Sequence, residues 1–381
     1  MTAPTWTLAC STCDAPIAHA GASLCPSCHQ PVFARYAAVP KGTPLAARWD
    51  MWRYQPFLPV LPGEVPVSLG EGLTPLSESP AMAAAVGVRR LWIKDESQNP
   101  TGSFKARGMS AAVTRAKAQG VPGLVVPTAG NAGAALAAYG AAAGLPIRVY
   151  APRTTPRPIL DTIEAMGAEL IRIEGHIGDA GKLALAYAAE SGFFPISTLR
   201  EPYRVEGMKT MGFEMAEQLG WRVPDVVVYP TGGGEGTVGI WKALQELHAG
   251  GWLAGERDQP QYVVAQAAGC APIARAFAAG ADRAEPWVDP VTYAAGLRVP
   301  SPLGDRLLLR VLRETDGVAG SASEEEIRTW TRRMAEATGI DAAPEDGCAL
   351  AVLRDAVGAG RVSADAEVVV FNTGAGASYR A

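Results

Sequence analysis

From Arg89 to the C-terminus, short apolar stretches alternate with longer segments of helical periodicity. The strand candidates are rich in Val and Ile, as in residues 123–129 (GLVVPTA), 225–231 (DVVVYPT) and 366–374 (AEVVVFNTG). Parallel strands need crossover helices between them, so strands and helices alternate along a chain that forms a parallel sheet. The sequence therefore predicts an α/β fold with mainly parallel sheets.

Composition and charge indicate which kinds of molecule the protein can bind. The 381 residues are 48% hydrophobic, which allows a large core, and the net charge of -4 gives no attraction to nucleic acid or a membrane surface. No apolar run approaches the roughly 18 residues that cross a bilayer. The N-terminus lacks the basic and apolar regions of a signal peptide. We expect a cytoplasmic protein that acts on a small molecule.

Two C-x-x-C pairs lie near the N-terminus, at Cys10 and Cys13 and at Cys25 and Cys28. Each pair can present two thiolates to one ion, and four thiolates make a closed, structural zinc site. His19 and His29 are possible substitute ligands, and the alternative is four free or oxidisable thiols. The connector that follows carries Trp49, Trp52, Tyr54 and Phe57, which we expect to pin it to the body of the protein.

Ligands of parallel sheets bind where strands lead into helix N-termini, so the loops after strands are the first places to search for chemistry. In the first such loop, NPTGSFKARG, Lys105 falls in the first turn of a predicted helix. A cation there faces the positive end of the helix dipole. Lys105 therefore either points into solvent or serves as a neutral amine.

The second loop is PTAGNAG, residues 127–133. Its small residues expose backbone N–H groups, and Asn131 adds a side-chain donor, which suits a carboxylate or a phenolic oxygen at a helix N-terminus. An ordinary tight turn with an Asn cap is the alternative.

The third loop, PTGGGEGT at residues 230–237, follows a strongly apolar strand. Consecutive glycines let N–H groups curl around a phosphate at a helix start. Gly234, Gly236 and Gly239 match the dinucleotide pattern, but Gln266 stands where an acidic residue would hold a ribose. A single phosphate monoester fits better than a dinucleotide.

The fourth loop, FNTGAG at residues 371–376, presents the hydroxyl of Thr373, which can face a heterocyclic nitrogen without having to protonate it. The alternative is a chain-terminal turn. An amine, a phosphate cradle, an Asn and a hydroxyl together meet the requirements of pyridoxal 5'-phosphate.

On these motifs the chain resembles the threonine synthase family of fold type II, tryptophan synthase β-like, pyridoxal-phosphate enzymes. The likeness begins at Leu69 and includes KDESQNPTGSFKARG, PTAGNAGAALAAYGAAAGLP, EPYRVEGMKT, PEDGCA and FNTGAGASY. It implies the following roles: Lys105 forms the Schiff base; Asn131 bonds O3'; Gly232, Gly233, Gly234, Glu235, Gly236 and Thr237 hold the cofactor phosphate; Thr373 faces the ring nitrogen; Thr128, Ala129 and Gly130 take the substrate carboxylate; and Arg204 and Lys209 bind a substrate phosphate.

The resemblance also implies an arrangement and a reaction. Residues 1–35 would form the zinc ribbon, 36–98 with 205–381 a large cofactor-binding domain, and 99–204 a small domain, in a homodimer. The implied reaction converts O-phospho-L-homoserine and water to L-threonine and phosphate. Ala106 and Met208 depart from the common SFKDRG and GQKT motifs. A threonine or serine ammonia-lyase, a racemase or a β-replacement enzyme stays open, as do a nicotinamide-dependent dehydrogenase and a non-catalytic binding protein.

Overall fold

The largest sheet confirms the predicted α/β architecture. The computed structural model describes residues 6–18 and 24–380. The sheet has the strand order β12-β11-β10-β13-β5-β4, and its strands are parallel except β4, which is antiparallel to β5. They span β12 (Val318–Ala322), β11 (Gln261–Ala267), β10 (Val226–Pro230), β13 (Glu367–Asn372), β5 (Arg90–Asp95) and β4 (Leu76–Glu78).

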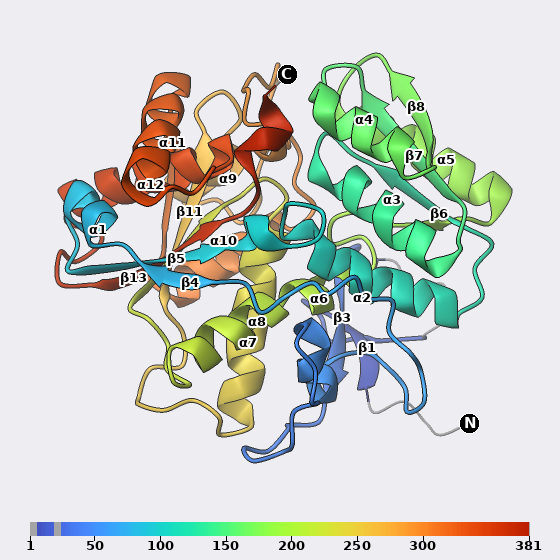
Figure 1. Cartoon of the computed structure of the whole chain (residues 1–381), viewed down its shortest axis with the longest axis horizontal. Helices are drawn as coiled ribbons and strands as arrows, with labels where there is room; N and C mark the ends of the chain where they lie inside the picture. The colour runs from blue at the N-terminus through green and yellow to red at the C-terminus, as the bar shows by residue number, and fades with distance from the viewer. Residues whose placement is uncertain (1–5, 19–23, 381) are drawn as a thin grey trace.

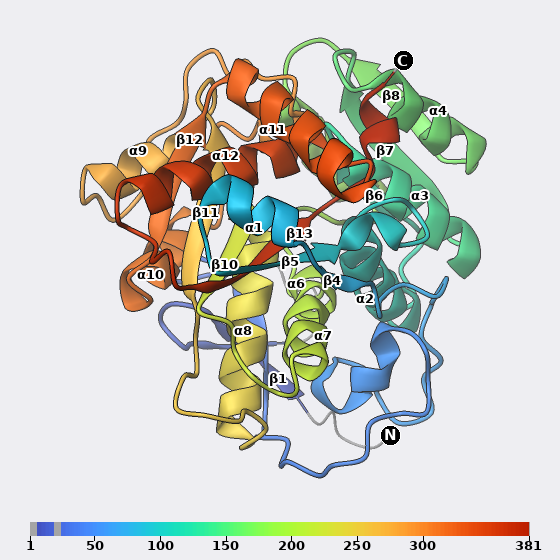
Figure 2. The same ribbon diagram turned by 60° about the vertical axis from the view of Figure 1, so that its left-hand side comes forward.

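Helices cover both faces of this sheet, because its strands are apolar on both sides. Val226 and Val228 join one core cluster and Val227 and Tyr229 the other, as expected when side chains alternate along a strand. Figures 1 and 2 show the two helical layers. One contains α1 (Pro80–Val86), α11 (Glu324–Thr338) and α12 (Pro344–Gly358); the other contains α7 (Thr210–Gln218), α8 (Glu235–Ala249), α9 (Pro272–Ala278) and α10 (Asp305–Glu314).

A second, parallel sheet has the order β8-β7-β6-β9. Its strands are β6 (Leu124–Pro127), β7 (Ile147–Pro152), β8 (Glu169–Ile173) and β9 (Phe194–Pro195). One face packs on α2 (Lys105–Ala118), α3 (Asn131–Ala143) and α4 (Arg157–Ala165), and the other on α5 (Ile177–Ser191). Figure 1 shows this second sheet beside the first.

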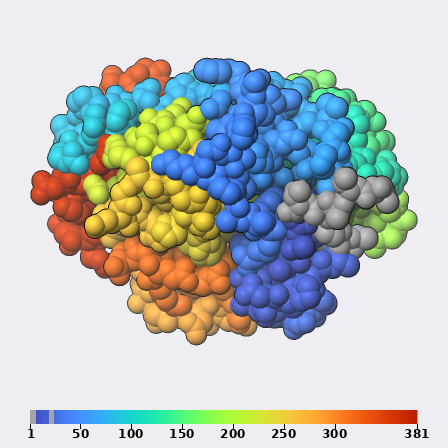
Figure 3. Space-filling model, turned by 90° about the horizontal axis from the view of Figure 1, so that it is seen from below, coloured from blue at the N-terminus to red at the C-terminus, as the bar shows by residue number. Residues whose placement is uncertain are grey.

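The N-terminal module, by which we mean the described residues from Trp6 to Tyr36, is a small antiparallel sheet of β1 (Trp6–Cys10), β2 (Pro16–Ile17) and β3 (Val32–Tyr36). Figure 3 shows this module and the connector, both in blue, spread over one face of the molecule. In the connector, Trp52, Tyr54 and Phe57 are buried as expected. Trp49 is wrongly predicted, since 86% of it is exposed.

The structure differs from the predicted elements at several places. The single helix expected around GMKT is divided into α6 (Arg204–Met208) and α7. Helix α10 and strand β12 were not predicted, and α12 begins at Pro344, before the expected start near Cys348. Within the described residues, no helix combines the length and apolar character needed to cross a membrane.

Candidate active site

The four loops singled out in the sequence meet at one cavity of about 380 Å³. Lys105 follows β5, Thr128 to Asn131 follow β6, Gly232 to Gly236 follow β10, and Thr373 follows β13. All of these residues line the cavity. The loops after β5, β10 and β13 meet because the carboxyl ends of parallel strands lie on the same edge of a sheet, and the loop after β6 comes from the second sheet. The lining includes residues from both large sheets and from α5.

Lys105 is the first residue of α2, and its Nζ lies 3.9 Å from the centre of the Phe104 ring. Burial, and next the positive charge of Arg204, lower the pKa of Lys105 to about 7, although Glu235 and Glu345 act in the opposite direction. A substantial share of this amine is therefore neutral near pH 7, as a nucleophile requires.

The glycine loop is closely packed against its surroundings. A Cβ at Gly232 would lie 2.3 Å from the carbonyl oxygen of Gly296. Gly234 has φ +86° and precedes the first residue of α8, and a Cβ there would lie 2.3 Å from Leu308 Cδ1. Side chains are thus excluded where backbone N–H groups meet the start of a long helix, which suits an anion such as a phosphate.

Glu235 and Arg204 form a buried charge pair at this loop. Glu235 Oε2 lies 2.8 Å from Arg204 Nη2, and Glu235 Oε1 accepts a hydrogen bond from the Leu199 N–H at 3.2 Å. Both side chains are almost fully buried. The Nε of Arg204 has no hydrogen-bond partner among the described residues. Arg204 therefore compensates the Glu235 charge, and it is one of the residues that line the cavity.

The loop after β6 is held by its own threonine. The Thr128 hydroxyl accepts from the N–H groups of Gly130 and Gly133, each at 3.1 Å, and the Thr128 N–H donates to the carbonyl of Tyr150 at 2.9 Å. Two of the N–H groups predicted to bind a carboxylate thus donate within the protein in this conformation. Asn131 begins α3 beside the cavity.

The loop after β13 involves residues that we did not predict. Thr373 donates to Asp346 Oδ1 through both its N–H, at 2.8 Å, and its hydroxyl, at 3.0 Å. The neighbouring Glu345 lines the cavity and accepts from the Gly296 N–H at 2.7 Å and from the Tyr379 hydroxyl at 2.8 Å. Burial raises the pKa values of both carboxyl groups. The motif PEDGCA was the only sequence signal for this pair.

Two predicted residues lie outside the cavity lining. Lys209 is fully buried behind α6, where its ammonium lies 2.6 Å from Glu206 Oε2 and 2.8 Å from Glu246 Oε2. Its ammonium group faces these carboxylates and not the cavity. Thr237 lies beyond the last lining glycine, and its hydroxyl is 3.2 Å from that of Thr231.

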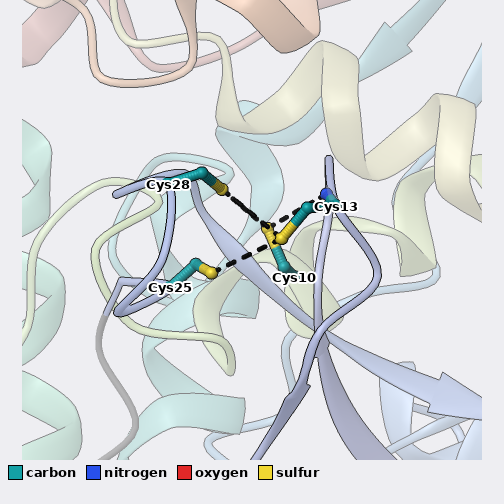
Figure 4. A group of neighbouring side chains, drawn as sticks. All are labelled: Cys10, Cys13, Cys25 and Cys28. Carbon is teal, nitrogen blue, oxygen red and sulfur yellow. Dashed lines mark hydrogen bonds between the residues drawn. The ribbon is translucent and has the colours of Figure 1, made fainter.

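The four N-terminal cysteines converge as their spacing predicts (Figure 4). Their sulfur atoms all lie within 4.8 Å of one another, with Cys10 and Cys28 3.4 Å apart and Cys13 and Cys25 3.7 Å apart. The N–H groups of Thr12 and Cys13 point at Cys10 Sγ. The backbone N–H of Cys28 is the main cause that lowers the pKa of Cys25 to about 6. His29 is outside this group, and His19 lies outside the described residues.

Comparison with known proteins decides the family. The model of the family described as "pyridoxal-phosphate dependent enzyme" matches residues 67–374 of this chain. The chain belongs to this family. It is 35% identical to a threonine synthase of Methanosarcina acetivorans, over 85% of this chain and 79% of the relative, and 34% identical to a threonine synthase of Mycobacterium leprae, over 85% and 86%.

Solved structures show the same fold. The serine racemase of maize superposes with a TM-score of 0.68 at 23% identity, covering 80% of this chain and 88% of that protein. Threonine deaminase isoform 2 of Solanum lycopersicum gives 0.66 at 18% identity, covering 88% and 95%. These likenesses support the fold type II architecture that the sequence motifs indicated.

The cavity fits pyridoxal phosphate on its own geometry. It offers a primary amine of lowered pKa, a cradle in which Cβ atoms are sterically excluded, and a buried Arg204 donor without a partner. The amine and the glycine cradle would bind the aldehyde and the phosphate of such a cofactor, and Arg204 would leave a cation for a substrate.

Proposed function

We propose that this pyridoxal-phosphate enzyme converts O-phospho-L-homoserine and water to L-threonine and phosphate. The observation that carries the proposal is the combination of a cavity amine with the similarity to threonine synthases over most of the chain. The cavity also contains more cationic groups than a cofactor phosphate needs, because Arg200 and Arg298 line it together with Arg204.

Each loop has a role in this proposal. Lys105 would bind the cofactor covalently, Gly232 to Gly236 would hold its phosphate, Asn131 would bond its phenolic oxygen, and Thr373 would lie on the side of its ring nitrogen. Bound pyridoxal phosphate withdraws electrons from the substrate Cα. The Lys105 amine would also take the proton from the substrate Cα, a task suited to a base whose pKa lies near 7.

The substrate phosphate needs its own cations. Arg204 is nearly fully buried and retains an unpartnered Nε, so it stays our candidate from the sequence. Arg200 and Arg298 replace Lys209, because both line the cavity and Lys209 does not. One guanidinium group can donate to two phosphate oxygens at once, which fixes the position of the leaving phosphate.

A product assay separates this reaction from its rivals on the same cofactor. The purified protein with pyridoxal phosphate is expected to release phosphate and L-threonine from O-phospho-L-homoserine. Formation of 2-oxobutyrate from threonine, without phosphate release from the phosphorylated substrate, would assign an ammonia-lyase instead. Interconversion of L and D amino acids would assign a racemase.

We propose that the four cysteines bind a structural zinc ion. About one zinc ion per chain is expected, since four thiolates close a tetrahedral site. Cys13→Ser is expected to lose the metal and, with it, about 3 kcal/mol or more of unfolding free energy. This is the stabilisation by a ligand that binds only the folded protein and is present at a hundred times its Kd. Cys270→Ser, a buried cysteine elsewhere, is the control that retains zinc. Equal metal content in both variants would contradict the site.

We further propose a cytoplasmic homodimer. All six cysteines are unpaired in the structure, in keeping with a reducing compartment. Trp49 and Val65 of the connector are 86% and 84% exposed, and such apolar side chains suit contact with a second copy. Light scattering of the purified protein checks the mass.

A further inference from the structure

The N-terminal module has no explanation in the cofactor-binding fold. The family match begins at residue 67, after the module and most of the connector. Yet the module is packed closely against the body of the protein. Trp6 and Leu8 of β1 and Val32 and Ala34 of β3 are buried in the same core cluster as Met109 of α2 and Tyr203, the residue before α6.

Several contacts of the module involve α6 and the residues on either side of it. The Trp6 ring meets the Tyr203 ring edge-on, with centroids 6.0 Å apart. The Tyr36 hydroxyl donates to Glu206 Oε2 at 2.9 Å, and the Tyr36 ring lies 4.0 Å from Lys209 Nζ. Tyr203 and Glu206 flank Arg204 in the chain. The module therefore holds both sides of a segment whose first helical residue faces the cavity.

Glu206 is the centre of a buried charge cluster. Its carboxylate lies 2.6 Å from Lys209 and 3.0 Å from Lys242, and Lys209 also pairs with Glu246 at 2.8 Å. Two cations and two anions balance one another here, and Tyr36 is the module's contribution to the cluster. Buried charges of this kind tolerate little displacement, because each depends on its neighbours for solvation.

Helices α6 and α2 are in turn locked together. A Cβ at Gly207 would lie 2.1 Å from the Arg107 carbonyl oxygen, and one at Gly108 would lie 2.4 Å from Met208 Cε. The two helices thus cross at glycines, with backbone against side chain or backbone. Helix α2 begins at Lys105 and α6 at Arg204, so this crossing sets the relative position of the two cavity cations.

We propose that the N-terminal module fixes α6 against α2, with Tyr36 and Trp6 as positioning residues for Arg204 and Lys105. The inference rests on the proposed role of Lys105 in binding the cofactor. Arg204 is the charge that, after burial, most lowers the pKa of Lys105, and Glu235 and Glu345 are the charges that raise it. A displaced α6 would weaken the Arg204 effect and leave the two carboxylates in place.

Tyr36→Phe removes one hydrogen bond to α6 and keeps the ring. In the holoenzyme, we expect the midpoint of the pH titration of the visible cofactor absorbance to rise by about half a unit, because a positive charge has moved away from the linked amine. We also expect KM for the phosphorylated substrate to rise about threefold to tenfold, with a smaller change in kcat. Tyr262→Phe is the matched control, since Tyr262 is fully buried in β11 and its hydroxyl donates to Gln259, at 3.0 Å, and not to α6.

The two tyrosine variants are expected to melt at similar temperatures, and only Tyr36→Phe should change the titration. Trp6→Leu disturbs the same segment from its other end and is expected to shift the midpoint in the same direction. A wild-type titration in a folded Tyr36→Phe or a folded Trp6→Leu would overturn the inference. A wild-type protein without any cofactor absorbance would instead refute the proposed function, so the two failures are distinguishable.

Discussion

Lys105→Ala is expected to abolish the visible absorbance of the covalently held cofactor and to lower kcat by at least about 10³-fold, as removal of a catalytic nucleophile does. The physical reason is that this side chain is the cavity amine whose pKa, about 7, leaves it free to attack an aldehyde near neutral pH. Borohydride reduction followed by mass spectrometry checks the claim, since the cofactor should be fixed to the peptide that contains Lys105.

The control is Lys117→Ala, which removes an exposed lysine from the same helix and should leave labelling and turnover unchanged. Lys105→Ala is not expected to unfold the protein, so a loss of labelling can be assigned to the missing amine. The pKa of Lys105 falls from 10.5 to about 7 on folding, so its burial lowers stability most below about pH 7 and not at all above 10.5. When both proteins lack the cofactor, the variant is therefore expected to have a higher free energy of unfolding than the wild type at pH 7. A Lys105→Ala protein that still incorporates reduced cofactor would refute the assignment.

The meeting of the four loops was predictable from the sequence. Lys105, Asn131, Gly232 and Thr373 each follow a strand of the predicted parallel type, and all line one cavity. Within the larger sheet the prediction needed no knowledge of distances, because parallel strands bring their carboxyl ends to one edge; the loop after β6 comes from the second sheet. Glycines and a misplaced lysine were then enough to suggest an anion and an amine.

Buried charge was not predictable in the same way. Lys94, Arg107, Lys209 and Lys242 are all buried, although these residue types are mostly exposed in proteins. Lys94 and Arg107 both pair with Glu214, far away in the chain, whereas Lys209 and Lys242 also pair within one helical turn, with Glu206 and Glu246. The sequence did not show that Lys209 lies outside the cavity lining, since a five-residue helix has no clear periodicity to indicate which side faces the cavity.

Elements with an unusual composition were also missed. Helix α10 alternates arginines with leucines in DRLLLRVLRE, a helical pattern that lies between the better-defined segments. Strand β12, VAGSA, has one β-branched residue and a central glycine, so its place at the sheet edge comes from pairing with β11. Glu345 reaches the cavity only because α12 starts four residues before the apolar run that indicated it.

Arg107→Met is expected to lower the free energy of unfolding by about 3 to 5 kcal/mol, the range for removing one partner from a buried ion pair. Arg107 is fully buried, two residues after Lys105, and its guanidinium lies 2.6 Å from Glu96 and 2.5 Å from Glu214. Methionine fills much of the same volume but leaves the buried carboxylates of Glu96 and Glu214 without the Arg107 charge. Urea unfolding at pH 7 measures the loss.

The control is Arg157→Met, because Arg157 is 67% exposed and its pair with Asp161 should contribute less than about 1 kcal/mol. The pH dependence is a second check. Burial raises the pKa of Glu214, but Arg107 and Lys94 outweigh it and lower that pKa to about 2. Without Arg107 the pKa should rise, so the difference between wild type and variant should grow as pH rises above about 2 and become constant above the raised pKa of the variant. A small loss that does not depend on pH would mean that α2, and Lys105 with it, is held by apolar packing instead of by this charge network.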